Sequence, residues 1–508
     1  MNQIDLNDLD DNSKQTDENY HLNFEGEPLK KGFGSSKALM TTELKQEIKE
    51  EAKTSILMFI PIFLAGIIGN AGGMVNVAFA GHIGTLEMSG VSLGVTLMNI
   101  TGNSFSSGIC TALDTLCSQE NGAGNKRRVG VVANRGLFML TVCACVVAFI
   151  WMFTVQAILQ AFGQEHSVAY FAQVFLRYMT IAIFPMFWAE GFRRTFAAIG
   201  IALPQAISGA VSLATLIVFE IVFVSKLNWG VKGAALALTI SYWAQFISLI
   251  VSSFFIKGLW KSYMVLPSKE IFQEIWTFLR LAIPGIIMIC AEWWAYEIGL
   301  IFAGIIGSAE LAAFASIIQV GNIIFQIPYS FGVVASSRVG NHLGAGNAPR
   351  AKRALIILLC MLAIAEVIYL STAYLLRPYI GPFFSNDPLV QRQIYIFVIY
   401  DIVMCIPDGF QVFFGGVIRG AGFQVFGAFN NIVSFYFVAL PLQALLAFCL
   451  RRTVQSLFLG LGAAPNIQLS LFVGKLIALN WNKLAEDISS ELKQKSESNE
   501  TTHLKTKD

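Results

Sequence analysis

Long apolar blocks alternate with short polar segments along most of the 508 residues of this chain. A bilayer core about 30 Å thick needs about 20 apolar residues per helix, and about twelve of the blocks reach that length. We therefore predict an all-α polytopic membrane protein with about twelve transmembrane helices. The blocks lie near 55–80, 89–111, 135–158, 172–190, 203–224, 234–256, 282–304, 312–335, 354–376, 394–416, 426–448 and 456–478.

Both ends of the chain are polar and rich in charge. Residues 1–54 lean acidic and lack apolar periodicity, so we expect a disordered tail and no signal peptide before the first span. We expect a bundle of six helices over 55–256, a linker over 257–281, a second bundle over 282–480 and a second tail over 481–508. All of these assignments follow from the apolar blocks alone.

The two halves of the chain repeat the same landmarks in the same order. The segment Gly122-Ala123-Gly124-Asn125 returns 222 positions later as Gly344-Ala345-Gly346-Asn347. The pattern Gly81-x-x-Gly84-x-x-Glu87 and Pro61 return 223 positions later, the proline as Pro284. A fixed period of this kind indicates an internal duplication. Each proline removes one helical hydrogen bond early in the first span of its half, so we expect the pair to have a conformational role.

Lysine and arginine predict the orientation in the membrane. With the amino terminus inside, the inner loops hold fifteen of these residues and the outer loops hold seven. Both termini are then cytoplasmic. Because six spans per half is an even number, the two halves cross the membrane in the same direction. A parallel repeat relates two bundles by an axis along the membrane normal, with a cavity between them, as in transporters that work by alternating access.

The composition argues against other classes of protein. The chain is 55% hydrophobic and 13% charged, whereas a soluble domain carries about 25% charge. It has no phosphate loop, no metal-ligand cluster and no nucleophile with a paired base, so we expect neither an enzyme nor a bound metal or cofactor. The eight cysteines lack metal-type spacing, and a net charge of +2 gives no reason to expect nucleic acid.

Acidic residues inside spans are expensive and need a function or a partner. Glu292 and Glu297 in the seventh span lie about 140° apart around the helix, so we expect them to face different sides of one cavity. Asp401 and Asp408 in the tenth span share a face. Four more acids are Asp114, Glu190, Glu220 and Glu366. We expect Asp114 to be a solvated cap at a span end and Glu190 and Glu220 to be structural. The roles of Glu366 and Asp401 stay open.

These acids suggest a coupling chemistry. A carboxylate in a dry cavity can hold a proton near neutral pH, and it can instead pair with an organic cation. A group that must lose its proton to bind the cation links the two movements. Trp293, Trp294 and Tyr296 are candidates for aromatic faces in the cavity that would attract a cation.

The chain resembles the multidrug and toxin extrusion (MATE) family over roughly residues 50–485, on the eukaryotic branch. The segments that carry the resemblance are 81–84, 99–102, 114–119, 122–125, 278–284, 292–297, 338–347, 419–424 and 480–481. The resemblance implies a proton-coupled antiporter of organic cations, in which Glu292, Glu297, Asp408 and Asn99 form the site. Animal members carry a further glutamate in the eighth span, where this chain has Gln319.

Several alternatives stay open at this point. One is a sodium-coupled antiporter, and another is a lipid-linked oligosaccharide flippase of the same architecture. The expected partners are an organic cation-like small molecule, protons and the lipid bilayer, and the expected state is a monomer. The membrane is either the cell surface or an internal acidic compartment. Subtracting the repeat offset pairs Glu292 with Gly69, Glu297 with Met74 and Asp408 with Met186, so the predicted proton sites belong to the second half alone.

Overall fold

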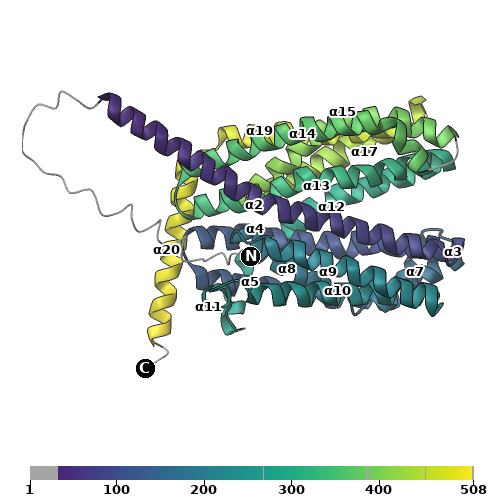
Figure 1. Ribbon diagram of the computed structural model, residues 1–508, viewed down its shortest axis with the longest axis horizontal. Helices are drawn as coiled ribbons and strands as arrows, with labels where there is room; N and C mark the ends of the chain where they lie inside the picture. The colour runs from purple at the N-terminus through teal and green to yellow at the C-terminus, as the bar shows by residue number, and fades with distance from the viewer. Residues whose placement is uncertain (1–32, 267, 385–387, 452–453, 506–508) are drawn as a thin grey trace, which may run out of the picture.

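The protein folds as two helical bundles that lie side by side, seen in a computed structural model (Figure 1). The structure describes residues 33–266, 268–384, 388–451 and 454–505. The first bundle holds α2 (Phe33–Gly81), α3 (Thr85–Met98), η1 (Asn99–Asn103), α4 (Ser104–Gly122), α5 (Lys126–Phe153), α6 (Val155–Ala161), α7 (His166–Met179), α8 (Ile183–Ala198), α9 (Leu203–Glu220), η2 (Ile221–Lys226) and α10 (Gly230–Phe254).

The second bundle follows a short connection made of α11 (Leu259–Tyr263) and η3 (Lys269–Phe272). It holds α12 (Ile275–Ile306), α13 (Ser308–Gly344), α14 (Ala348–Phe384), α15 (Pro388–Gly420), α16 (Gln424–Asn431), η4 (Ile432–Ala439), α17 (Leu440–Ala444), η5 (Leu445–Arg451), α18 (Val454–Leu461) and α19 (Ala463–Ala478). The last helix, α20 (Trp481–Lys505), lies across the ends of the bundles (Figure 1). We call this end of the molecule the terminal face, because the last described helix, α20, covers it.

The predicted membrane protein is confirmed. Ten helices in the described part of the chain are long and apolar enough to span a bilayer, and the pair α7 and α8, bent by 62°, makes an eleventh. The remaining predicted span, near 89–111, forms the run α3, η1 and α4, whose second half buries many polar side chains. These polar side chains keep the mean hydropathy of the run below that of a helix surrounded by lipid. Neighbouring helices enclose the run instead.

Two of the expected boundaries were wrong. Helix α2 begins at Phe33, so residues 33–54 are helical where we expected disorder, while residues 1–32 lie outside the described part. The polar segment continues the helix of the first span and packs its carboxylates against arginines of the second bundle. Helix α12 begins at Ile275, inside the segment that we assigned to the linker.

The first helix of each half begins against the opposite bundle. Met58 and Ile62 of α2 pack in the apolar core of the second bundle, and Phe278 and Ala282 of α12 pack in the core of the first. Both helices run through their proline, Pro61 or Pro284, close to these contacts. The paired prolines therefore mark the two places where one bundle reaches into the other.

The repeated Gly-Ala-Gly-Asn segments meet each other at the terminal face. A Cβ on Gly122 would overlap the carbonyl oxygen of Asn341, and a Cβ on Gly344 would overlap that of Gln119. Shifting the residues of the first contact by 222 positions, Gly122 forward and Asn341 back, gives the two residues of the second contact. The contact between α4 and α13 therefore has local twofold symmetry. The second glycine of each segment, Gly124 or Gly346, has φ of 80° or 73° and ends its helix. Side chains strengthen this closure, since Asn121 donates to Asn341 over 2.6 Å.

Candidate functional site

Two carboxylates of the second bundle share one amide donor. The Nε2 atom of Gln411 lies 3.1 Å from Glu292 Oε1 and 3.2 Å from Asp408 Oδ1. Asn431 Nδ2 donates to the other oxygen of Glu292 over 3.3 Å. Glu292 and Asp408 are each 8% exposed, and neither forms an ion pair with a cation among the described residues. The arrangement holds two acids together with neutral donors only.

Three helices bring these groups together. Glu292 lies in the middle of α12, Asp408 follows Pro407 on α15, and Asn431 closes α16 directly before the π-helix η4. A π-turn widens the backbone and is common at functional sites. Asn99 opens another π-turn, η1, and accepts a hydrogen bond from Asn103 over 2.8 Å. Sequence analysis missed Gln411 and Asn431. The only feature that could have identified them is that each is an uncharged amide inside an apolar span.

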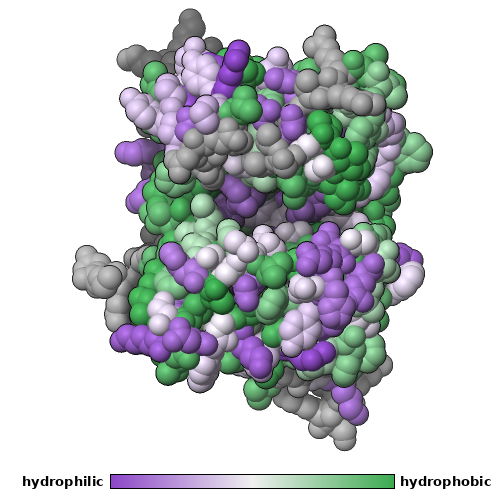
Figure 2. Space-filling view, turned by 90° about the vertical axis from the view of Figure 1, so that its right-hand side faces the viewer, coloured by the Kyte–Doolittle hydropathy of each residue, from purple (hydrophilic) through white to green (hydrophobic). Residues whose placement is uncertain are grey.

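The cavity between the bundles has two connected parts. A deeper part of about 400 Å³ is lined by Glu292, Asp408 and Asp401. A wider part of about 750 Å³ reaches residues such as Met74 and Met88 near the end opposite to the terminal face. Figure 2 views that end and shows a hollow between the two halves with hydrophilic residues inside. The cavity is therefore accessible from the end opposite to the terminal face, and the twofold glycine contact closes the other end.

The predicted site residues occupy different parts of this cavity. Asn99, Glu297 and Tyr296 line both parts, and Trp293 lines the deeper part. Gln319 lines the wider part, as do Gly69 and Met74, the repeat counterparts of Glu292 and Glu297. Met186, the counterpart of Asp408, lines both.

Trp294 lies at the contact between the bundles. Its indole nitrogen donates to the carbonyl of Ile100 over 3.3 Å, and its ring lies 6.3 Å from that of Phe105. This position gives it a packing role between α12 and the first bundle.

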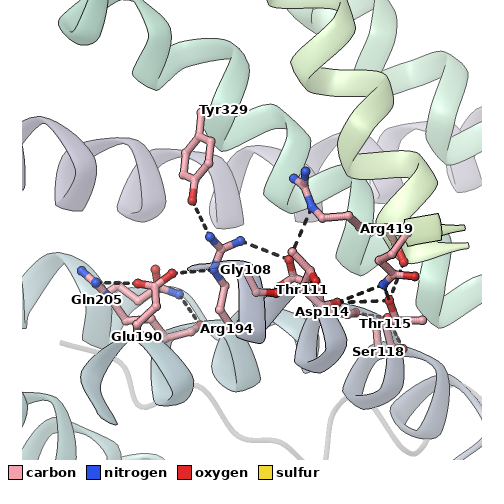
Figure 3. A network of polar contacts seen from close by, with 12 residues as sticks. Gly108, Thr111, Asp114, Thr115, Ser118, Glu190, Arg194, Gln205, Tyr329 and Arg419 are labelled. Carbon is pink, nitrogen blue, oxygen red and sulfur yellow. Dashed lines mark hydrogen bonds and ion pairs between the residues drawn. The ribbon is translucent and has the colours of Figure 1, made fainter. Parts of the chain in front are cut away.

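Figure 3 shows a buried network of ion pairs and hydrogen bonds. Three of its residues, Glu190, Arg194 and Tyr329, line the deeper part of the cavity. Arg194 of α8 contacts Asp114 Oδ2 over 3.1 Å and Glu190 Oε1 over 2.7 Å, and it also donates to the hydroxyl of Tyr329. Arg419 of α15 lies 3.7 Å from the same Asp114 oxygen. The network joins α4 and α8 of the first bundle to α13 and α15 of the second.

The position of Asp114 corrects the expectation of a solvated cap. It is 4% exposed and held by two arginines from different bundles. It lies inside α4, which continues to Gly122, and its partners come from residues 80 or more positions away, which local sequence patterns do not reveal.

The acid Glu220 lies apart from the cavity. It is fully buried and accepts a hydrogen bond of 2.6 Å from Asn76 Nδ2, which joins α9 to α2. Among the described residues, no group of three or more His, Cys, Asp or Glu side chains is arranged to hold a metal ion.

Comparisons with known proteins agree with this architecture. The MatE family model matches residues 61–223 and 284–445, and each match begins at one of the paired prolines. The chain is 33% identical to multidrug and toxin extrusion protein 1 of Danio rerio over 452 residues, which covers 89% of this chain and 75% of that protein. It is 31% identical to multidrug and toxin extrusion protein 1 of Homo sapiens, with 86% and 76% covered.

A solved structure supports the same assignment. The eukaryotic MATE transporter AtDTX14 is 27% identical and superposes with a TM-score of 0.82, covering 88% of this chain and 100% of that one. The family match extends over both bundles and includes the helices that carry Glu292 and Asp408. The chain therefore belongs to the MatE family of multidrug and toxin extrusion proteins, which are multi-pass membrane transporters and not enzymes.

Proposed function

We propose that this protein is a secondary active antiporter that exports organic cations in exchange for protons. The observation that carries the proposal is the shared donor Gln411, which holds Glu292 and Asp408 together without a cation. Two unpaired carboxylates that are both ionised in a buried site would cost several kcal/mol. The site therefore favours a bound proton when it is empty and a cationic substrate when it is deprotonated.

The cavity wall suits an organic cation. Tyr296 and Trp293 lie on the same helix as Glu292 and line the same part of the cavity. Aromatic faces near a carboxylate attract an organic cation through their quadrupole. Glu297 lies where the two parts of the cavity join, which suits a residue that meets the substrate on its way in or out. The names of the relatives describe the extrusion of many drugs and toxins, which supports a broad class of small organic substrates.

The membrane orientation completes the proposed cycle. If the terminal face is cytoplasmic, as the fifteen inner and seven outer basic residues predict, the cavity is open to the outside or to the lumen of an acidic compartment. Protons enter from that side and release the substrate. Each pH unit across the membrane then supplies about 1.4 kcal/mol per proton. One chain provides both bundles, so we propose that the monomer is the working unit.

The test uses the purified protein in lipid vesicles. An imposed pH gradient should drive the accumulation of tetraethylammonium, a cation without a proton of its own. Glu292→Gln and Asp408→Asn should abolish this accumulation, whereas Gly69→Ala and Met186→Leu, their counterparts in the first half, should retain it. Full pH-driven transport by both acid variants would refute the mechanism.

A sodium gradient at constant pH separates the two coupling ions. Accumulation under that condition, and none under the pH gradient, would mean that sodium is the coupling ion. A lipid-linked oligosaccharide substrate is a weaker alternative, because the four acids of the second-bundle wall would repel its phosphates. These acids are Glu292, Glu297, Asp401 and Asp408.

A further inference from the structure

Glu366 is a buried acid that the proposed exchange at Glu292 and Asp408 does not use. It lies on α14, is 3% exposed, and its Oε1 atom has no hydrogen-bond partner. A Cβ on Gly409 of α15 would overlap that same oxygen. The carboxyl group therefore points at the backbone next to Asp408, and only a glycine leaves room for it there.

No cation compensates this acid within the described residues. The titratable groups that interact with it are Asp408 and Cys405 of α15 and Tyr369 of its own helix. Helix α2 has no titratable side chain from Ser55 to Gly81. Between Glu310 and Arg338, α13 contributes only Tyr329, which turns to Arg194. Helix α20 also packs against α14. Ala348 and Ala351, at the start of α14, belong to the same apolar cluster as Trp481 and Ala485 of α20.

Tyr369 connects this acid to the cavity. It lies three residues after Glu366, on the same face of the helix, and it lines the deeper part of the cavity. Its hydroxyl has no hydrogen-bond partner, and it would lie 3.4 Å from a Cβ on Gly409, the position that Glu366 Oε1 also crowds. Two buried, unpartnered polar atoms thus lie over the same glycine, one on Tyr369, which lines the cavity, and the other on Glu366 behind it.

We propose that Glu366 is a second proton-binding residue, filled and emptied through Tyr369, whose occupancy depends on the charge at Asp408. This inference rests on the proposed proton antiport. An ionised Asp408 keeps the proton on Glu366, because two adjacent carboxylates resist ionising together. A substrate cation paired with Asp408 cancels that charge and lets Glu366 release its proton. The tyrosine hydroxyl accepts one proton and gives up another, so it is unchanged after each transfer.

The consequence is a larger number of protons exchanged per substrate. Substrate binding displaces one proton at the Glu292 and Asp408 pair and another at Glu366. We therefore expect the natural protein to exchange about two protons per tetraethylammonium, because the coupled acids release their protons together. Glu366→Gln lacks one of these acids and should exchange about one. Glutamine reproduces the shape and hydrogen-bonding groups of the protonated acid, so a purely structural Glu366 would tolerate it without any change.

The experiment measures the tetraethylammonium gradient at equilibrium as a function of the imposed pH difference, with the membrane voltage clamped to zero. The slope of the logarithmic plot should fall from about two to about one in Glu366→Gln. Tyr369→Phe should slow the approach to equilibrium and leave the final slope unchanged. An unchanged slope in Glu366→Gln overturns the inference while leaving the proposed antiport standing. Absence of any pH-driven gradient in the natural protein overturns both.

A second measurement does not depend on transport. Tetraethylammonium added to the purified protein in weak buffer should release about two protons per bound cation, and about one for Glu366→Gln. Equal proton release by both proteins contradicts the inference.

Discussion

The two bundles share one scaffold but treat the buried acids at and next to the cavity in opposite ways. In the first bundle, Asp114 and Glu190 are each held by an arginine at 3.1 Å or less. In the second, Glu292 and Asp408 share only the neutral amide of Gln411. A paired buried charge is fixed in one protonation state, whereas an unpaired acid can gain or lose a proton. Next to the cavity, the first bundle therefore holds fixed charges, whereas the second holds the acids that we propose to exchange protons.

The largest expected effect tests the paired charges. Arg194→Gln leaves the buried Asp114 with only Arg419 at 3.7 Å and removes one of the two arginines that hold Glu190, which should cost about 3–5 kcal/mol of stability. The melting temperature in detergent should fall by several degrees, whereas Glu292→Gln should leave it unchanged or raise it. If both variants melt at the same temperature, the distinction between paired and unpaired bundles is wrong.

The next effect tests the unpaired acids. Asp408→Asn should lower pH-driven transport about 100-fold, the equivalent of about 2.8 kcal/mol, because the site loses a group that binds both the proton and the cation. Its counterpart Met186→Leu should stay within about twofold, well under 1.4 kcal/mol. The initial rate of tetraethylammonium uptake in vesicles gives both values. An equal loss in the two variants would indicate general damage to the cavity instead of a proton site.

A smaller effect tests how the bundles meet. Gly344→Ala places a methyl group against the carbonyl oxygen of Gln119 and should shift the conformational equilibrium about tenfold, or about 1.4 kcal/mol, towards separation at the terminal face. Cysteines placed at Asn121 and Asn341 should then cross-link less. The control is Gly474→Ala, where the added carbon has no neighbour within 4 Å. Equal cross-linking in the two variants would exclude Gly344 from the closure.

The smallest effect adds an acid to the wider part of the cavity. Gln319→Glu should lower the KM for tetraethylammonium about threefold, since a partly solvated charge pair contributes about 0.2–1 kcal/mol. Gln319→Met keeps the size of the side chain without its charge and should not reproduce the gain. A KM that rises in the glutamate variant would mean that this position does not face the substrate.

Much of the fold follows from the order of residues, because a bilayer imposes a minimum apolar length on each helix. That rule located ten or eleven of the spans, and the repeat of Pro61 at Pro284 predicted two equivalent bundles. The rule of minimum apolar length gave less information about α4. There, Asp114 and Thr115 are buried by contacts with distant helices instead of by lipid. A hydropathy scale assumes that each residue is surrounded by one uniform solvent. A helix enclosed by other helices is surrounded by protein, so the scale does not describe it.

The candidate site was only partly predictable for a similar reason. Glu292 and Asp408 stand out as charges in apolar segments, and the structure brings them together on one donor. The donor itself, Gln411, lies only three residues from Asp408 but looks like an ordinary polar residue in the sequence. Its role depends on how α12 and α15 are placed relative to each other, and no local pattern encodes that placement.

The twofold contact between Gln119 and Gly122 on one side and Asn341 and Gly344 on the other has a consequence for the origin of the chain. A contact in which each surface meets its own copy is the kind that two identical subunits form. Two separate half-length proteins would meet through the same residues, and every substitution would then appear twice. Fusion into one chain removes that restriction, so one half could acquire Glu292 and Asp408 while the other kept Gly69 and Met186.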